Sequence, residues 1–327
     1  MINRFDIVQR NGKIDMGSIS PRYLIDNRNQ MIWSYVIYIA ILFSSCSNTP
    51  INMETELIEK SGTYYNKVND MPYTGEAYSN FGEQVKKSSG YLSKGKKEGE
   101  WVEWHENGKM RSKENYENGE ANGIWEQWFR NGKIKLRASF RRGKAHGQRM
   151  EWYENGKKKQ EGYFKDNEFD GQWSKWYPSG RLSAEGKYVQ NKEDGKHTFW
   201  HANGKKKSEA MFSKGQIVGH RIDWYENGQK KEQGTADGLW TQWYDNGVKK
   251  AEGYYKNQLP MGKHVLWHPN GKKMSTMNFI NGRPHGQRIE WYDNGQKKEI
   301  GIFVNGDQSG VWTYYNKDGS IDGTEEY

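Results

Sequence analysis

A glycine that recurs with a fixed period is the feature that most constrains this chain. Of the ten intervals between successive glycines of the series, nine measure 24 residues and one, from Gly219 to Gly238, measures 19. A period of this length predicts an array of repeats in which each unit packs only on its neighbours. The series consists of Gly75, Gly99, Gly123, Gly147, Gly171, Gly195, Gly219, Gly238, Gly262, Gly286 and Gly310.

A second glycine lies nine residues after the first, usually behind an asparagine. One unit reads GQRMEWYENGKKKQEGYFKDNEFD: an aromatic strand, an Asn-Gly turn, a second strand and a polar loop. Asn-Gly between two strand-like runs predicts a hairpin turn in which both central residues have positive φ. We therefore expect an all-β fold, an elongated single-layer array of antiparallel β-hairpins. It comprises about eleven 24-residue repeats over residues 71–327, the first divergent and serving as a cap.

Alternation along a strand divides each unit into two faces. Positions three and five after the first glycine share one face, as Ile222 and Trp224 do after Gly219. We expect this face to be the core, with second-strand glycines such as Gly162 lying across from the tryptophans at position five. Positions two and six lie on the other face and are rich in Trp, Arg and Tyr, which are typical contact residues. The candidate binding surface comprises Trp101, Trp125, Arg149, Tyr153, Trp173, Tyr177, Arg221, Tyr225, Trp240, Tyr244, Arg288 and Tyr292.

The lysines that follow each Asn-Gly pair, such as 157–159 and 205–207, predict a basic stripe along one edge of the ribbon. Edge lysines discourage pairing with other sheets, and they could also bind acidic headgroups or anionic polysaccharide. Lysines interleaved with aromatic residues also suit nucleic acid. Because an exported protein rarely meets nucleic acid, we expect no such partner.

No pattern of catalytic or metal-binding residues emerges. His197 with His201, and His264 with His268, have a spacing that binds metal on a helix, but on a strand it separates side chains by about 13 Å. The single cysteine excludes a disulfide within the chain and a cysteine-based metal cluster. We expect no metal, no cofactor and no enzymatic activity.

Residues 31–46 have the features of an export signal. An uncharged run from Met31 ends at the small residues Ser44 and Ser45 before Cys46, and it is shorter than the roughly 20 residues that span a bilayer. Leu42 to Cys46 resembles a bacterial lipobox, which implies a signal helix and lipid attachment at Cys46. Residues 1–30 are expected to be an N-terminal extension, with Met16 and Met31 as alternative translation starts, and residues 47–70 a tether.

The recurring pattern G-x-W-x-x-W-Y-x-N-G-K-x-K-x-E-G-x-Y resembles the variant MORN repeat over about residues 71–327. Bacterial chains of such units are often labelled YwqK-family antitoxins of toxin–antitoxin systems. The resemblance implies a single-layer sheet used for protein or lipid contacts, and it assigns no catalytic residue.

These observations predict a lipid-anchored, non-enzymatic binding or scaffold protein of the bacterial cell envelope with a protein partner. Three alternatives stay open. The aromatic residues suit cell-wall polysaccharide, the lysine stripe suits acidic phospholipid, and the antitoxin label implies a cytosolic complex with a toxin.

Overall fold

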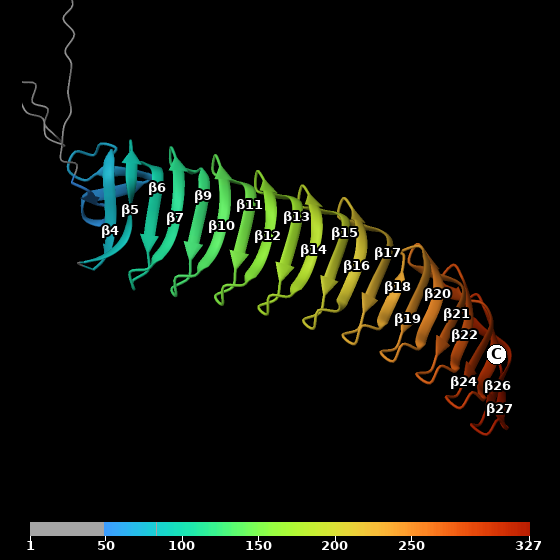
Figure 1. Ribbon diagram of the computed structural model, residues 1–327. Helices are drawn as coiled ribbons and strands as arrows, with labels where there is room; N and C mark the ends of the chain where they lie inside the picture. The colour runs from blue at the N-terminus through green and yellow to red at the C-terminus, as the bar shows by residue number, and fades with distance from the viewer. Residues whose placement is uncertain (1–48, 83) are drawn as a thin grey trace, which may run out of the picture. The chain divides into compact units, whose positions relative to one another are not determined.

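The computed structural model describes residues 49–82 and 84–327, which belong to one unit, Asn48–Tyr327. The predicted signal peptide, the N-terminal extension and Cys46 lie outside the described residues. The described part is almost entirely β-structure, dominated by one open sheet of 25 strands (Figure 1). The predicted all-β array of hairpins is confirmed.

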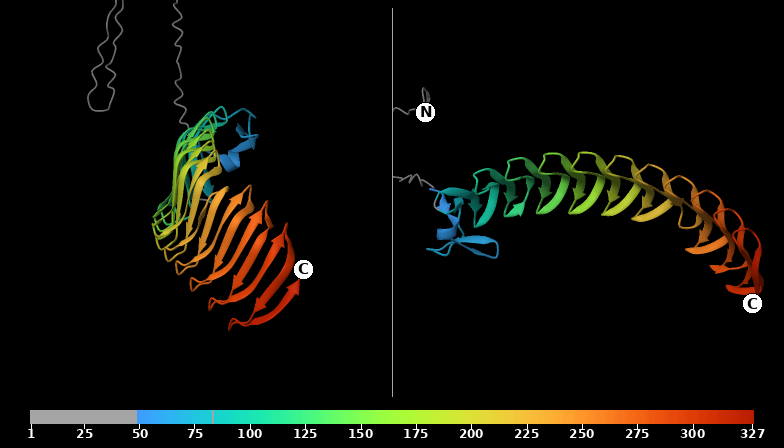
Figure 2. Two further views of the ribbon diagram at one scale, coloured as in Figure 1. Left: turned by 90° about the vertical axis from the view of Figure 1, so that its right-hand side faces the viewer. Right: turned by 90° about the horizontal axis from the view of Figure 1, so that it is seen from below.

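The strands from β4 to β27 follow one another across the sheet in chain order, and all their pairings are antiparallel. The two-residue strands β8 and β23 pair with β7 and β22, to which β9 and β24 also pair, and β1 pairs in parallel with β4. Seen by itself, this unit is an elongated ribbon that bends and twists along its length (Figure 2). The strands of the sheet are β1 Ile51–Asn52, β4 Gly75–Phe81, β5 Val85–Ser93, β6 Lys96–Trp104, β7 Met110–Glu117, β8 Glu120–Ala121, β9 Gly123–Trp128, β10 Ile134–Arg141, β11 Lys144–Trp152, β12 Lys158–Lys165, β13 Glu168–Trp176, β14 Leu182–Val189, β15 Lys192–Trp200, β16 Lys206–Ser213, β17 Gln216–Trp224, β18 Lys230–Gly234, β19 Gly238–Trp243, β20 Lys249–Lys256, β21 Leu259–Trp267, β22 Lys273–Ile280, β23 Arg283–Pro284, β24 Gly286–Trp291, β25 Lys297–Val304, β26 Asp307–Tyr315 and β27 Ile321–Glu326.

Two kinds of turn alternate along the chain, and the structure corrects their expected assignment. At the Asn-Gly turns only the glycine has positive φ, as at Gly156, whose N–H donates to the carbonyl of Tyr153. The tight two-residue turns lie at the opposite end of the strands. Asp166 and Asn167 both have positive φ there, as two-residue hairpin turns require. The segments expected to be polar loops are thus the tighter turns.

The register places the core on the face opposite to the one predicted. Gly162 of β12 pairs with Arg149 of β11 and Trp173 of β13, both of which occupy position two, and not with Trp152. A bulge beside the Asn-Gly turn, where Lys159 is the extra residue, fixes this register. The largest fully buried side chains of the described repeats lie on the glycine face. They are Leu92, Trp101, His197 and Trp312.

The segment expected to be a tether forms a cap on the first strands. Its elements are α1 Met53–Glu56, β2 Leu57–Lys60 and β3 Thr63–Asn66, and β2 and β3 pair as a separate hairpin. Leu57 packs with Ala77 and Leu92 of the sheet and with Trp101 to form a buried cluster. A repeat array needs such a cover because its first unit has no neighbour on one side.

Within residues 49–82 and 84–327, no helix is long and apolar enough to cross a membrane.

Candidate functional site

We call the glycine-bearing side of the sheet the ladder face. Here the ring at position two hydrogen-bonds, in four units, to the carbonyl one residue beyond the facing second-strand residue, whereas the buried indole nitrogen of Trp312 has no partner among the described residues. Trp101 donates its indole N–H to the carbonyl of Tyr91 at 3.0 Å, and Nε2 of His197 lies 2.8 Å from the carbonyl of Lys187. Trp and His can therefore replace one another at position two, because each has a ring nitrogen that can contact this backbone carbonyl.

Aromatic rings two residues beyond the glycines complete this face. The ring of His197 lies between those of Tyr188 and Phe212, with centroids 5.2 and 5.0 Å away. Such edge-on contacts each contribute about 0.5–1.5 kcal/mol beyond area burial. The same arrangement surrounds Trp125, between Tyr116 and Phe140, His264, between Tyr255 and Phe279, and Trp312, between Phe303 and Tyr327.

The second-strand residue varies with the ring that it faces. A Cβ on Gly301 would lie 2.1 Å from Cδ2 of Trp312, so glycine is required for the indole to lie flat on the strand. In six units a second-strand glycine lies opposite the Trp or His at position two of the following strand. Where the next position-two residue is arginine, the equivalent residue is instead Ala138, Ala210 or Met277. Glu114, which precedes Trp125, departs from this rule.

Arginine at position two makes a different set of contacts. Arg149 donates two hydrogen bonds to Oε1 of Glu151, at 2.7 and 3.1 Å, and its guanidinium lies 5.8 Å from the centre of the Phe164 ring. Partial burial raises the pKa of Glu151, but hydrogen bonds from Arg149 and Gln160 outweigh it and hold the pKa below its usual value. Arg221 and Arg288 form the equivalent pairs with Asp223 and Glu290.

Of the candidate binding residues, those at position two are therefore built into the ladder face. Trp101 is only 1% exposed, so the expectation that it lies on an open surface is wrong. The alternation of faces was correctly anticipated, but the register that decides which face is packed was not. The members of this group are Trp101, Trp125, Arg149, Trp173, Arg221, Trp240 and Arg288.

The candidate tyrosines at position six connect successive repeats. Tyr153 donates its hydroxyl to the carbonyl of Trp176 in the next unit at 2.8 Å. Histidine does the same elsewhere: Nε2 of His201 lies 2.9 Å from the carbonyl of Trp224, and Nε2 of His268 the same distance from that of Trp291. Equivalent bonds join Tyr177 to Trp200, Tyr225 to Trp243, Tyr244 to Trp267 and Tyr292 to Tyr315.

The histidine pairs considered as metal ligands are thus accounted for by backbone contacts. His197 and His264 belong to the ladder face, and His201 and His268 belong to the row at position six. No group of three His, Cys, Asp or Glu side chains in the described part of the chain could hold a metal ion.

The Asn-Gly-Lys sequence links each turn to the next. Asn155 donates its amide to the carbonyl of Pro178, and Lys157 donates to the carbonyl of Ser179. The lysine stem crosses the following turn, where a Cβ on Gly180 would lie 3.1 Å from Cδ of Lys157. The first lysine after each of these turns is consequently engaged within the ribbon. The same lysine bond recurs at Lys109, Lys133, Lys205 and Lys272.

The opposite side of the sheet, which we call the Trp–Lys face, carries the tryptophans at position five. Lys158 lies 5.5 Å from the centre of the Trp176 ring and donates to Glu161 at 2.8 Å. Lys206 repeats this arrangement with Trp224 and Glu209. The second lysine after the turn is therefore paired with a carboxylate in these units, as Lys249 is with Glu252, whereas Lys230 donates to the amide oxygen of Gln233.

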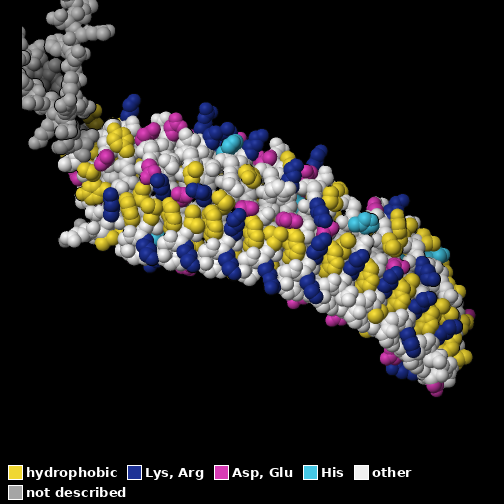
Figure 3. Space-filling model, in the orientation of Figure 1, with side chains coloured by type: hydrophobic (Ala, Val, Ile, Leu, Met, Phe, Trp, Pro, Cys, Tyr) yellow, Lys and Arg dark blue, Asp and Glu magenta, His cyan; other side chains and the backbone are white. Residues whose placement is uncertain are grey.

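A row of exposed apolar residues, not expected from the sequence, runs along the Trp–Lys face. These residues directly follow either the first glycine of a unit or the second-strand glycine position, and two of them, Leu239 and Tyr254, pair directly across strands. In Figure 3, apolar side chains alternate with lysines and arginines along the visible side of the ribbon. This exposed apolar row consists of Tyr91, Ile124, Tyr163, Met211, Leu239, Tyr254, Ile302 and Val311.

Comparison with solved structures adds no argument about function. One solved structure that matches this chain is described as the crystal structure of TcdB2-TccC3. It shares 9% sequence identity, covers 83% of this chain and 17% of that chain, and has a TM-score of 0.16. This chain thus spans less than a fifth of that protein's length. No curated protein matches this chain.

Comparison with protein families gives a definite result. The matched family is described as the MORN repeat variant, and each matched segment contains one Asn-Gly turn together with the two strands that flank it. The chain contains six units that match the MORN repeat variant, at residues 97–118, 121–141, 145–166, 193–214, 236–257 and 284–305.

Proposed function

We propose that the chain is a non-enzymatic scaffold of the bacterial envelope that binds a protein partner through the exposed apolar row. The observation that carries the proposal is the repetition of this row on a long open sheet. Tyr, Met and Leu side chains of this row are exposed, whereas the aromatic rings of the ladder face pack mainly against one another. Repeat ribbons offer extended surfaces of this kind, and MORN repeats suggest such a binding or scaffold role.

A protein partner accounts for the Trp–Lys face better than an acidic polymer. Lys158 and Lys206 are each held by a carboxylate of their own strand, at 2.8 and 2.7 Å. Binding a phosphate or a polysaccharide carboxylate there would require these pairs to separate. An apolar row bordered by paired charges instead resembles a protein interface, with an apolar centre and a polar rim.

The test compares the wild-type chain with a triple variant, Tyr163→Ser, Met211→Ser and Tyr254→Ser. Each tagged chain is crosslinked in the source cell, purified and analysed by mass spectrometry. A stoichiometric envelope protein recovered with the wild type and lost with the variant supports the proposal. A matched control substitutes Val68, Met71 and Phe199 with serine, because these are exposed apolar residues outside the row.

Recovery of a cytosolic toxin would instead support the antitoxin alternative and contradict the envelope assignment. If the triple variant retains its partner, the exposed apolar row is not the binding surface. Binding of the purified chain to acidic liposomes or cell-wall glycan, with the triple variant unaffected, would favour the ligand-binding alternatives.

We further propose that a lipid on Cys46 holds the chain at the membrane. The proposal rests on the uncharged run from Met31 and the small residues that precede Cys46. Cells fed an alkyne-labelled fatty acid should label the wild type and not a Cys46→Ser variant, and the variant should move to the soluble fraction. Equal labelling of both chains would refute the anchor.

A further inference from the structure

The short repeat interrupts the ladder face. In a full unit the second-strand glycine and the next first glycine are nine residues apart, as in Gly162 and Gly171, whereas Gly234 and Gly238 are separated by four. The five missing residues include the strand end and the two-residue turn. β18 accordingly stops at Gly234 and makes only two residue pairs with β19.

The shortened connection also removes one ring. Ala236 stands two residues after Gly234, where the other described repeats place a ring of the ladder face or, in the first unit, Leu92. The rings in the equivalent position are Tyr116, Phe140, Phe164, Tyr188, Phe212, Tyr255, Phe279, Phe303 and Tyr327.

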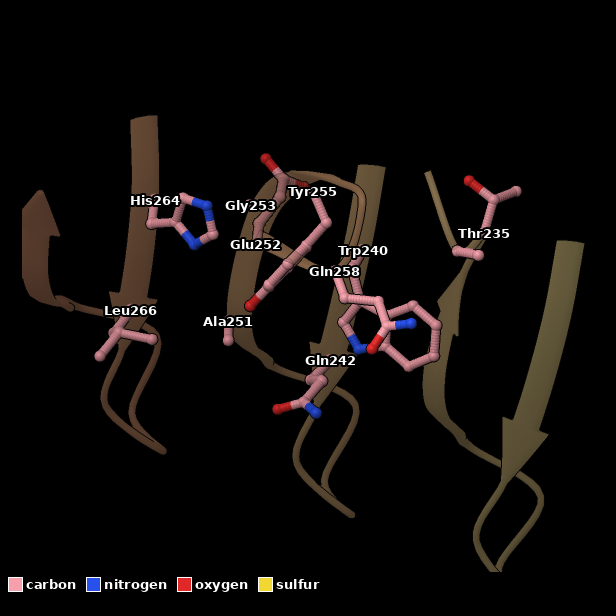
Figure 4. A pocket seen from close by; sticks show the side chains of 11 residues that line it. Thr235, Trp240, Gln242, Ala251, Glu252, Gly253, Tyr255, Gln258, His264 and Leu266 are labelled. Atoms are coloured by element: carbon pink, nitrogen blue, oxygen red, sulfur yellow. The ribbon is translucent and has the colours of Figure 1, made fainter. Parts of the chain in front are cut away.

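The result is an open slot beside Trp240, with a volume of about 340 Å³. Figure 4 shows Trp240, Tyr255 and His264 projecting into it from successive strands. The indole of Trp240 lies flat on Gly234, because a Cβ there would be 2.1 Å from Cε3. In the described part of the chain, Trp240 takes part in no ring pair, whereas Trp312 has two.

The edge of the slot carries polar groups. Thr235, Gln242 and Gln258 line it together with the aromatic side chains. Gln242 has one long contact within the chain, from Nε2 to the Glu232 carboxylate at 3.4 Å. Apolar walls with a few amide and hydroxyl groups at the rim are the usual composition of a small ligand site.

We propose that this slot binds one planar aromatic ring bearing a hydrogen-bonding group, such as a phenol or an indole. The chain itself supplies the argument, since Trp125 and Trp312 each receive a Tyr or Phe ring at the equivalent place, 5.4 and 5.1 Å away. An incoming ring would restore the contact that Ala236 leaves out, and the amides would bind its polar group. The slot lies on the ladder face, so this proposal does not depend on the exposed apolar row.

The ring can come from a free small molecule or from an aromatic side chain of another protein. The probes are therefore N-acetyl-3-fluoro-L-tyrosinamide and the same fluorotyrosine within a blocked Gly-Tyr-Gly peptide. Fluorine NMR of each probe with the full-length chain reports binding without interference from the 15 tryptophans. Line broadening with both probes fits a side chain of a partner, and broadening with only the free amino-acid amide fits a small molecule.

Ala236→Phe is the decisive variant, because it supplies the missing ring from within the chain. We expect it to weaken probe binding by at least about tenfold, the factor that corresponds to about 1.4 kcal/mol. Ala202→Phe adds the same ring in an exposed turn and should leave binding unchanged. Far-ultraviolet circular dichroism and thermal melting of both variants report whether they fold.

A second variant keeps the proposal testable even if Ala236→Phe unfolds. Phe303→Ala removes the ring that lies 5.1 Å from Trp312 and should create a second slot, adding one binding equivalent. Absence of broadening with the wild type, unchanged broadening with a folded Ala236→Phe chain, or no added site with a folded Phe303→Ala chain would each overturn the proposal. Displacement of the probe by N-acetylglucosamine at equal concentration would show that the slot favours sugars and would also overturn it.

Discussion

Tyr153 donates its hydroxyl to the carbonyl oxygen of Trp176 across the boundary between two repeats, at 2.8 Å. Since each repeat is stabilised mainly by its neighbours, a bond at this boundary contributes to the cohesion of the ribbon. Tyr153→Phe keeps the ring and removes the donor, so we expect it to lower the free energy of unfolding by about 0.5–1.5 kcal/mol. Urea denaturation followed by circular dichroism measures the change. Tyr153→His should restore part of the loss, because His201 and His268 make the equivalent contact.

Phe129 occupies the same position in its unit and has no hydroxyl to donate. Phe129→Tyr should therefore place a hydroxyl near the carbonyl of Trp152 and raise the free energy of unfolding by about 0.5–1.5 kcal/mol. The measurement is the shift of the urea midpoint relative to the wild type. A midpoint that falls would show that the ring cannot approach this carbonyl as Tyr153 approaches the next one.

Gly301→Ala tests the close approach of the indole to the strand. The added Cβ would lie 2.1 Å from Cδ2 of Trp312, and overpacking of this kind typically costs about 1–3 kcal/mol. The thermal midpoint should fall accordingly. Gly323→Ala is the control, because its Cβ would meet no atom within 4 Å. Equal effects of the two substitutions would exclude the indole contact as the cause.

Two carboxylates of the sheet should respond to pH in opposite directions. Burial and the facing Asp223 raise the pKa of Glu232 above its usual 4.5, so the stability that this group contributes is present below pH 4.5 and is lost as pH rises through the raised pKa. Glu232→Gln should therefore stabilise the chain at pH 7, by a few tenths to about 1 kcal/mol. The gain should disappear at acidic pH.

Glu209 provides the matched comparison. Hydrogen bonds from Lys206 and Lys196 hold its pKa below 4.5 despite some desolvation, so its stabilising contribution is present above pH 4.5 and is lost as pH falls through the lowered pKa. Glu209→Gln should destabilise the chain at pH 7 by less than about 1 kcal/mol, because the pair is partly exposed. Urea titrations at pH 7 and at acidic pH measure both variants. If both substitutions changed the free energy of unfolding in the same direction at pH 7, the opposite pKa shifts of Glu232 and Glu209 would be contradicted.

The period and the alternation of side chains sufficed to predict the hairpin array, but they left open which face packs. That choice depends on the bulge at Lys159. Without it, the register of the pair Trp152 and Lys158 would place Gly162 opposite Gln148, whereas with it Gly162 lies opposite Arg149. One sequence signal could have indicated it. Apart from Glu114 before Trp125, glycine precedes a ring at position two, and alanine or methionine precedes an arginine, so the two positions vary together and point to direct contact.

The slot beside Trp240 was only partly predictable. The 19-residue interval and the missing aromatic strand end around Ala236 are visible in the sequence, and they indicate a local irregularity there. The sequence does not show that position two lies on the ladder face. Without that knowledge, it cannot be inferred that the irregularity leaves Trp240 without a stacking partner. The exposed apolar row escaped notice for the same reason, because Tyr163 and Tyr254 lie on the face that was expected to be the core.

Adjacent lysines after an Asn-Gly turn should differ in their importance. Lys157 donates to the carbonyl of Ser179 in the next turn, and its stem packs across Gly180, whereas Lys158 lies over Trp176 and pairs with Glu161 on the exposed face. Lys157→Met preserves the stem and removes the donor, which should cost about 1 kcal/mol. Lys158→Met breaks a surface ion pair and should cost less than about 0.5 kcal/mol, with the difference narrowing in high salt. Urea denaturation at low and high salt distinguishes them, and if Lys158→Met proved the more damaging change, the turn-to-turn link would not be what holds neighbouring repeats in register.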